Sequence, residues 1–376
     1  MEAFQFYIAL YIVLSLIFIL IIIATLVGNA FVIAAIITQP CLHQPQNYLL
    51  ISLAVADITV GVFVMPIAIA DMYFNQWNFG AFACVMWRTA DVFCCTCSIL
   101  NLGVIALDRY LAVNYPLQYT RWRTKAFILS LTASVWIASV LISMPPLVAH
   151  ILTARETFLV KDIEGLNQCQ LFRNKGYVIY STAGSFAIPY LAILFLYAKV
   201  YLVIRRQNKH CKHKYNILNQ LGPQGPSFAL GAAGVMRDRK DRKSPTKVKY
   251  VAPEEQNESL NNSTFTKPTD HELIFIQQLV SIKEAERAKI YLAREKKALK
   301  VLVIVTGMFS VCWIPFFVLY LIEGLCNTWT AHPVLSYAVT WAGYFNSSLN
   351  PVIYTIFNRE FNATFKKWYR SKFCFK

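Results

Sequence analysis

Charged residues are scarce in this sequence. Only 15% of its 376 residues are Asp, Glu, Lys or Arg, whereas 56% are hydrophobic. A soluble domain of this size would contain about a quarter charged residues. The deficit argues against a soluble protein and favours a chain that is surrounded by lipid.

The sequence also lacks the motifs of common enzyme chemistry. It contains no cluster of metal ligands, no nucleophile elbow and no glycine-rich phosphate loop. An enzyme is therefore the least favoured class of function.

Seven long apolar stretches make up most of the chain. A helix that crosses the hydrocarbon core of a membrane needs about 20 mainly apolar residues. The first stretch is too long for a signal-peptide core and has no basic region before it, so we interpret it as a retained helix; a cleaved signal peptide followed by six spans is the alternative. We predict an all-α fold, a bundle of seven transmembrane helices, with spans at 8–38, 46–72, 81–114, 125–149, 176–205, 298–323 and 333–356.

The basic residues, which give a net charge of +16, are concentrated on one side of this bundle. They follow the third, fifth and seventh spans, at 121–125, 205–300 and 359–376. This is the positive-inside pattern. It predicts a multi-pass protein of the plasma membrane with its amino terminus outside and its carboxyl terminus in the cytosol. The expected basic-side partners are therefore membrane lipids and cytosolic proteins, not nucleic acid.

The segments outside the spans differ in composition. Residues 207–271 are too polar to bury a core, so we predict a disordered third cytosolic loop between the five-helix part, 1–206, and helices six and seven, 272–356. In 357–376, aromatic and basic residues alternate, which favours a short amphipathic helix at the inner membrane surface. Cys374 in this tail is a candidate for palmitoylation; an unmodified cysteine is the alternative.

Four of the ten cysteines, Cys94, Cys95, Cys97 and Cys312, lie inside apolar spans, where they serve packing. Cys84 and Cys169 lie on the predicted outer side, where disulfides form, and we propose that they pair. Cys326 is also outside and has no evident partner.

Two aspartates, Asp57 and Asp91, lie within predicted spans, where a charge costs about 2.5–3.5 kcal/mol on insertion scales. Asp91 follows Cys84 by seven residues, which places it roughly 10 Å below the outer cysteine. Cys95 and Ser98 share its helical face. No Lys or Arg lies near that depth in the other spans. A cationic ligand would neutralise Asp91; pairing with Tyr or Ser hydroxyls is the alternative.

The third and sixth spans share a register. Arg109 comes 18 residues after Asp91, and Trp313 comes 18 residues after Glu295 on a helix of opposite direction. Equal separations predict an ionic contact between Arg109 and Glu295 at the inner end, with Trp313 level with Asp91. A solvated Glu295 is the alternative.

Three prolines interrupt the later spans. Pro189, Pro315 and Pro351 should each bend a helix, because proline removes a backbone hydrogen bond. Three kinks near polar groups favour helices that move. A purely structural role for each proline is the alternative.

Polar residues gather in the second, third and seventh spans. Their oxygens would suit a small hard cation such as Na⁺; plain interhelical hydrogen bonding is the alternative. We expect no other cofactor. The residues are Asp57, Ser98, Asn346, Ser347 and Asn350.

Six sets of residues, one in each span except the fifth, resemble the motifs of rhodopsin-like G-protein-coupled receptors, and the resemblance covers all seven spans. The sets are Gly28-Asn29; Leu53, Ala54 and Asp57; Asp108-Arg109-Tyr110; Trp136; Cys312-Trp313-Ile314-Pro315; and Asn350-Pro351 with Tyr354.

The resemblance implies how such a chain would signal. Arg109 would engage a heterotrimeric G protein when the sixth helix moves outward, and arrestin and receptor kinases would be further partners. Tyr197 and Tyr354 would stabilise the active form, and a core switch would consist of Ile99, Pro189 and Phe309.

Within that family the chain looks like the biogenic-amine receptors. Trp87 precedes Asp91 by one turn, and WAGYFNS contains Trp341 and Tyr344. The resemblance implies that Asp91 binds the ligand ammonium and that aromatic rings stack on the ligand. The implied ligand-binding set is Asp91, Cys95, Thr96, Ser181, Thr182, Ser185, Trp313, Phe316, Phe317, Tyr320, Thr340, Trp341 and Tyr344.

The identity of the amine is less constrained. The strings GYVIYSTAGSF and DVFCCTCSILNLGVIALDRY resemble serotonin receptors of types 1 and 7. Ser185, Tyr320 and Thr340 resemble dopamine, octopamine, tyramine or alpha-2 adrenergic receptors. We favour serotonin, and the long third loop with a short tail resembles receptors coupled to inhibitory G proteins. A non-amine receptor and an amine transporter are the more distant alternatives; a transporter would have related halves and broken helices.

Overall fold

The structure is a computed structural model that describes residues 2–74, 76–153, 159–161, 167–170, 174–220, 270–326 and 331–373. The chain forms two compact units. One comprises Met1–Ile204 with Glu295–Lys376, and the other comprises Arg205–Arg294. The first unit contains the helical bundle and every site discussed below.

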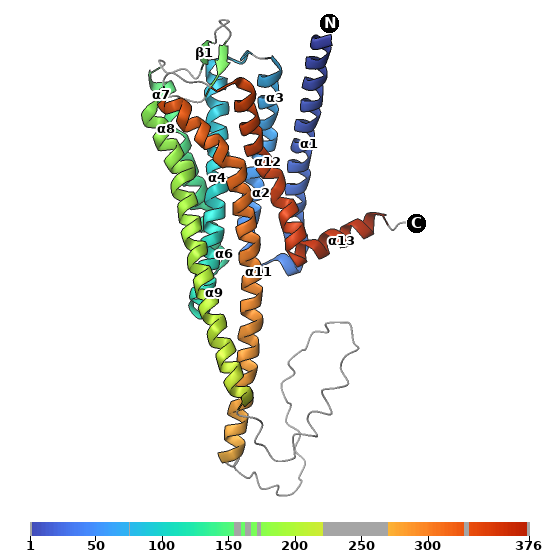
Figure 1. Cartoon of the computed structure of the whole chain (residues 1–376), viewed down its shortest axis with the longest axis vertical. Coiled ribbons are helices and arrows are strands. Elements are labelled where there is room, and N and C mark those ends of the chain that lie inside the picture. Colours follow the sequence, from blue (N-terminus) through green and yellow to red (C-terminus); the bar gives the residue numbers. More distant parts are fainter. Residues whose placement is uncertain are drawn as a thin grey trace. The chain divides into compact units, whose positions relative to one another are not determined.

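Long helical segments form this bundle (Figure 1). They are α1 (Glu2–Thr38); α2 (Asn47–Thr59), the π-helix η2 (Val60–Val64) and α3 (Met65–Phe74); α4 (Gly80–Asn114); α6 (Lys125–Ser143) and α7 (Pro145–Thr153); α8 (Lys175–Thr182), the π-helix η3 (Ala183–Ala187) and α9 (Ile188–Gln220); α11 (Asp270–Leu325); and α12 (Pro333–Phe357). The short elements are η1 (Pro40–Leu42), α5 (Pro116–Trp122), β1 (Leu159–Lys161), β2 (Asn167–Cys169) and α13 (Arg359–Phe373).

The helices agree with the seven predicted spans. Among the described residues, six are long and apolar enough to cross a membrane. The seventh, α12, has 25 residues, enough to span, but it is interrupted by Asn346, Ser347, Ser348 and Asn350, which lower its mean hydropathy. All four of these polar residues, which make α12 less apolar than the other spans, are buried inside the bundle.

One predicted boundary is wrong. The polar loop was expected to begin at residue 207, but α9 continues to Gln220. Lys, Asn, His and Gln are polar, yet a helix that has already been nucleated can extend through such residues at little cost. The rest of the predicted loop, 221–269, lies outside the described residues.

Large apolar side chains cover the outside of the bundle. Leu20, Leu141, Phe195 and Val311 are each more than 60% exposed. Such a surface would be costly in water but is favourable against lipid tails. The bundle therefore buries polar groups inside and presents apolar groups outside.

The π-helix η2 is stabilised by a neighbouring helix. A π-turn disturbs the regular backbone ladder, and Pro66, two residues after the end of η2, has no N–H to donate. The indole Nε1 of Trp87 on α4 donates a hydrogen bond to the carbonyl of Val64 at 3.1 Å. Trp87 thus fixes the second span against the third at the outer end.

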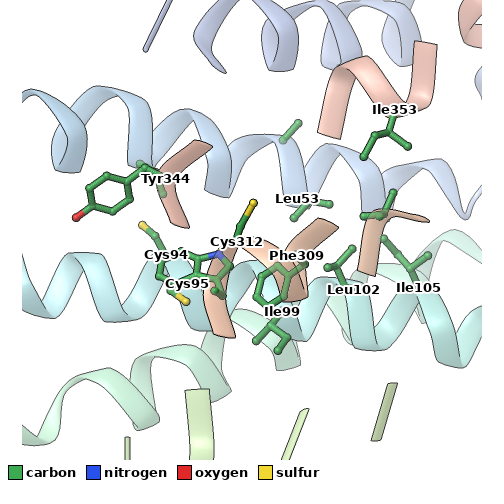
Figure 2. Packing of buried hydrophobic residues seen from close by; sticks show 14 of the residues in the cluster. Leu53, Cys94, Cys95, Ile99, Leu102, Ile105, Phe309, Cys312, Tyr344 and Ile353 are labelled. Carbon is green, nitrogen blue, oxygen red and sulfur yellow. The ribbon is translucent and has the colours of Figure 1, made fainter. Parts of the chain in front are cut away.

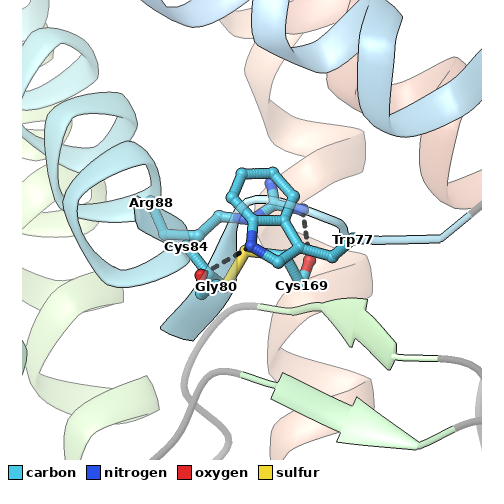
Figure 3. The surroundings of a disulfide bond; sticks show 5 residues. All are labelled: Trp77, Gly80, Cys84, Arg88 and Cys169. Atoms are coloured by element: carbon cyan, nitrogen blue, oxygen red, sulfur yellow. Dashed lines mark hydrogen bonds between the residues drawn. A yellow bond between two sulfur atoms is a disulfide. The ribbon is translucent and has the colours of Figure 1, made fainter. Parts of the chain in front are cut away.

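A disulfide joins the amino-terminal end of α4 to the β1–β2 pair of strands. The predicted pair Cys84–Cys169 is bonded, and β1 and β2 run antiparallel. Figure 3 shows Trp77 beside this bond, with its indole N–H donating to the carbonyl of Gly80 at 2.7 Å. The disulfide therefore ties the β1–β2 segment to α4.

The predicted helix after the seventh span is α13, which runs sideways from the end of α12 (Figure 1). Phe361 is fully buried, and Phe365 and Trp368 contact Phe31 of α1 edge-on, with ring centroids 5.5 and 5.2 Å apart. Its apolar face packs against the bundle, as the amphipathic pattern indicated.

Gly28 permits α1 to pack closely on α12 at Pro351, and this contact is testable. A Cβ at Gly28 would lie 2.9 Å from Cγ of Pro351, whose ring cannot rotate away. We expect Gly28→Ala to destabilise the protein by about 1–3 kcal/mol through overpacking. The measurement is the melting temperature in detergent, followed with a thiol-reactive dye that reports exposure of buried cysteines.

Gly307→Ala is the matched control, because a Cβ there meets nothing within 4 Å. Its melting temperature should stay the same or rise, since alanine is the better helix former. Equal melting temperatures for the two variants would contradict the proposed close contact.

Candidate functional site

Asp91 of α4 lies in the interior of the bundle against α12. The hydroxyl of Tyr344 donates a hydrogen bond to its Oδ2 at 3.0 Å. The two residues are only 7% and 1% exposed. In the part of the chain that the structure describes, no basic side chain forms an ion pair with Asp91. A buried carboxylate with one hydroxyl partner can still accept a cation.

A cavity adjoins this pair. It is small, with about the space that one water molecule needs. Asp91 and Trp313 both line it, as the predicted register of the third and sixth helices requires. The full lining is Val60, Asp91, Cys95, Ser98, Trp313, Tyr344, Asn346 and Ser347.

Aromatic rings surround the cavity on the side of α11. Phe316 meets Trp313 edge-on with centroids 5.6 Å apart, and Phe317 lies 6.1 Å from the same indole. Phe186 of η3, which the sequence analysis did not single out, stacks on Phe317 at 4.5 Å. Gly343 of α12 makes room for the indole, because a Cβ there would come within 2.9 Å of Trp313.

The hydroxyls predicted on the fifth helix fall into two kinds. Ser181 donates to the hydroxyl of Tyr320 at 3.4 Å. Thr182 Oγ1 and Ser185 Oγ are buried without a hydrogen-bond partner. Burying an unpaired hydroxyl is unfavourable, so these two are groups that a ligand or a water can satisfy.

Of the predicted ligand-binding residues, Asp91, Cys95, Trp313 and Tyr344 line the cavity, and the others lie outside its lining. Three of those others contact groups away from the cavity. The hydroxyls of Thr96 and Thr340 donate to their own helices, to the carbonyls of Val92 and Ser336, and neither lines the cavity. Trp341 stacks on Phe18 of α1 at 3.8 Å, and its Nε1 has no partner. Spacing alone could not distinguish a hydroxyl that bonds its own helix from one that faces the cavity.

The predicted cation set is divided between the cavity lining and the neighbouring residues Asp57 and Asn350. Asn350 Nδ2 donates to Asp57 Oδ2 at 2.8 Å, whereas Asp57 Oδ1 is buried without a partner. Ser98, Asn346 and Ser347 line the cavity above. The donor set consists of a carboxylate and neutral oxygens, which fits a hard cation.

An ionic cluster closes the inner end. Arg109 bonds the adjacent Asp108, and its Nη1 lies 3.8 Å from Glu295 Oε2, as the register predicted. Asp108 also accepts from Tyr119, at 2.7 Å, and from Arg123, at 3.0 and 2.8 Å. Burial and the Asp108 charge raise the pKa of Tyr119, so its hydroxyl remains a donor.

The predicted switch residues occupy the layer between these sites. Figure 2 shows the ring of Phe309 beside Ile99, and both are fully buried. The hydroxyl of Tyr197 lies 3.1 Å from Thr306 Oγ1, and that of Tyr354 is buried without a partner. Pro189 of α9 and Tyr110 of α4 are partly buried.

Two charged residues near the site were missed. Asp71 of α3 is 5% exposed, and Arg88 of α4 lies three residues before Asp91. Arg88 is close enough to interact electrostatically with both aspartates. Both residues fall within the predicted span limits, so the same argument that singled out Asp57 and Asp91 would have found them.

Comparisons with known proteins agree with this geometry. The family model for the seven-transmembrane receptor (rhodopsin family) matches residues 28–354. The chain is 38% identical to the 5-hydroxytryptamine receptor 1D of Mus musculus over 354 residues, 92% of this chain and 85% of the mouse protein. It is 37% identical to the same receptor of Homo sapiens, over 96% of this chain and 89% of that protein. It is 33% identical to the octopamine receptor of Bombyx mori, over 94% and 87%.

Proposed function

The chain belongs to the rhodopsin family of seven-transmembrane receptors, and we propose that it is a receptor for a small protonated biogenic amine, with serotonin as its ligand. The observation that carries this proposal is the buried Asp91 carboxylate, which has a Tyr344 hydroxyl as its partner and no ion pair among the described residues. A protonated amine supplies the missing charge. An amine is larger than the cavity, so its binding requires the surrounding side chains to move apart.

The rest of the site suits an aromatic amine. Trp313, Phe316 and Phe317 offer ring faces and edges to an aromatic ligand and to its ammonium group. The unpartnered hydroxyls of Thr182 and Ser185 offer hydrogen bonds to a ring hydroxyl or indole N–H. Serotonin carries an ammonium group, a ring hydroxyl and an indole N–H.

A phenolamine is the second candidate. Relatives named for 5-hydroxytryptamine and for octopamine both match nearly the whole chain. The higher identity to the former favours serotonin, whereas Ser185 and Tyr320 favour octopamine, tyramine, dopamine or an adrenergic ligand.

Signalling would proceed through the inner end of the bundle. The contact of Arg109 with Glu295 joins α4 and α11, and Pro315 lies within α11 between Trp313 and Phe316. Outward movement of the inner part of α11 would free Arg109 to bind a heterotrimeric G protein, of the inhibitory class by the length of the third loop. Receptor kinases and arrestin would then bind the active form.

The same proposal fixes the location and orientation of the chain. The receptor lies in the plasma membrane with its amino terminus outside, which the distribution of Lys and Arg supports. Its basic helix α13 would lie on the inner leaflet. Cys374, the proposed palmitoylation site, lies outside the described residues.

A sodium ion below the amine would act as an allosteric ligand. Asp57 would provide the charge through its unpartnered Oδ1, and the nearby hydroxyls of Ser98 and Ser347 would complete the oxygen set. The ion would supply the positive charge that the buried Asp57 lacks and favour the closed bundle.

The first test is a second-messenger assay with serotonin, octopamine, tyramine, dopamine, adrenaline and histamine. Serotonin should give the lowest half-maximal concentration, and Asp91→Asn should raise it by about 100-fold or more, because the carboxamide cannot pair with an ammonium. Glu323→Gln, which removes an outer-end carboxylate away from the site, is the control. Undiminished activation of Asp91→Asn would overturn the amine assignment, and a lower value for octopamine would overturn serotonin.

The inner contact predicts the level of basal activity. Glu295→Gln removes the partner charge of Arg109 and should raise ligand-independent G-protein activation severalfold. Glu286→Gln, an exposed glutamate farther along α11, should leave it unchanged. The measurement is guanine-nucleotide exchange at matched receptor density. Equal basal rates in the wild type and in both variants would rule out a restraining role for Glu295.

The sodium proposal has a separate readout. Raising NaCl at constant ionic strength, with N-methylglucamine as the replaced cation, should weaken agonist binding to the wild type. Asp57→Asn should abolish this dependence. Asp71→Asn, which alters a carboxylate outside the cation set, should keep it. A salt response that survives Asp57→Asn would contradict a cation at this carboxylate.

A further inference from the structure

The carbonyl oxygen of Leu141 on α6 lacks its usual helical donor. In a regular helix a carbonyl accepts from the N–H four residues later, and that residue is Pro145, which has no N–H. The neighbouring donors do not replace it, because Met144 N donates to the Val140 carbonyl at 2.9 Å and Pro146 also has no N–H. Leu141 is 66% exposed on the outside of the bundle. Against lipid an unsatisfied carbonyl is costly, so this one requires a donor from another element.

Tyr180 of α8 supplies that donor. Its hydroxyl donates a hydrogen bond to the Leu141 carbonyl at 3.1 Å. Tyr180 is itself 44% exposed, and a phenol hydroxyl that faces lipid needs a protein partner as much as a carbonyl does. Each group therefore satisfies the other, and the bond joins the fifth span to the fourth from the lipid side.

The π-helix η3 makes such an anchor necessary. α8 ends at Thr182, and the wider turn of η3, Ala183–Ala187, separates it from α9. An i→i+5 turn shifts the helical register, so α9 alone does not fix the direction in which α8 presents its side chains. Contacts made by α8 and η3 themselves must fix this direction.

The same segment lies close to α6 at a second point. A Cβ at Gly184 of η3 would lie 3.2 Å from Cγ2 of Ile142, the residue after Leu141. Glycine permits this close approach of the fifth span to the fourth. Tyr180 and Gly184 are four residues apart, so both contacts lie on one side of the helical segment.

On another side α8 contacts α11. A Cβ at Gly324 would lie 2.6 Å from Cγ2 of Val178, so the two helices approach each other closely. Ser181 Oγ donates to the hydroxyl of Tyr320 at 3.4 Å. α8 is therefore held between the fourth and sixth spans, and Tyr180 provides a hydrogen bond to the fourth.

The two unpartnered hydroxyls of the site belong to the segment that Tyr180 anchors. Thr182 lies two residues after Tyr180, and Ser185 lies five residues after it. Thr182 and Ser185 are 6% and 1% exposed, and Thr182 Oγ1 and Ser185 Oγ have no hydrogen-bond partner. A rotation of the segment about its axis would move these hydroxyls and the tyrosine together. The bond on the lipid side therefore affects how the hydroxyls are presented to a ligand.

We propose that the Tyr180 hydroxyl sets the rotation of this segment and so determines how strongly the receptor favours an aromatic amine with a ring hydroxyl over the same amine without one. Tyr180 is a positioning residue, because it does not line the cavity. The inference rests on the proposed function, since it assumes that Thr182 and Ser185 bind the ring hydroxyl. It adds a determinant of ligand specificity on the lipid-facing surface.

The experiment is saturation binding of tritiated serotonin and tritiated tryptamine, which differ only in the ring hydroxyl, to membranes of the full-length receptor. If the panel identifies a phenolamine, tyramine and phenylethylamine form the pair. Tyr180→Phe should weaken binding of the hydroxylated amine by about fivefold and leave the other amine within about twofold. Tyr201→Phe is the matched control, because Tyr201 is a 54% exposed tyrosine on α9; it should change neither Kd.

A second background separates positioning from general damage. Thr182→Val with Ser185→Ala removes both hydroxyls, so nothing is left for Tyr180 to orient. In this background, Tyr180→Phe should leave the ratio of the two Kd values unchanged within about twofold. Because both amines are measured on the same receptor, this ratio does not depend on how many receptors fold.

Four results would overturn the proposal. The wild type could bind the two amines equally, or Tyr180→Phe could leave the ratio unchanged. It could also weaken both amines equally, or change the ratio just as much when the Thr182 and Ser185 hydroxyls are absent. Retained binding of both amines by Asp91→Asn would instead mark a failure of the amine assignment.

A rescue variant covers the case in which Tyr180→Phe does not reach the cell surface. Adding Pro145→Ala provides an N–H for the Leu141 carbonyl without restoring the bond between the two spans. The double variant should still show the reduced preference for the hydroxylated amine relative to Pro145→Ala alone. An unchanged ratio between these two receptors contradicts the proposal.

Discussion

A negative charge in the middle of an apolar bundle is the constraint on which this structure depends. Asp91 is buried and has one protein partner, the Tyr344 hydroxyl. Placing it there is costly, and a soluble or purely structural helix would have no reason to retain it. We propose that a cationic ligand offsets this cost, which would make the carboxylate the origin of ligand affinity. The surrounding aromatic rings and unpartnered hydroxyls make sense as groups that complete the ligand's contacts.

Two other buried carboxylates lie at different depths in the bundle. Asp57 has an unpartnered oxygen below the cavity, and Asp108 at the inner end is satisfied by Arg109, Arg123 and Tyr119. Each of these three carboxylates needs a positive or hydrogen-bonding partner, and among the described residues Asp108 alone of the three has a full set. We propose that the other two bind cations, whereas Asp108 positions Arg109. Movement of α11 about Pro315 would connect the amine site to that arginine.

Sequence reasoning recovered the seven spans, the disulfide and the level of the paired residues, because these follow from length, side and helical rise. The Arg109–Glu295 contact and the shared cavity of Asp91 and Trp313 follow from counting residues along two antiparallel helices. It did not recover the directions of individual hydroxyls. Thr96 and Thr340 bond their own backbones, which depends on rotamers and not on spacing. It overlooked Asp71 and Arg88, although they carry charge within a predicted span. The extent of α9 beyond residue 207 depends on propagation of a helix that is stabilised elsewhere, which composition does not reveal.

The most direct measurement of the central claim is the structure of the receptor with serotonin bound, at a resolution that identifies the ammonium nitrogen. The account predicts this nitrogen about 3 Å from an Asp91 carboxylate oxygen. An ammonium group located elsewhere would contradict it.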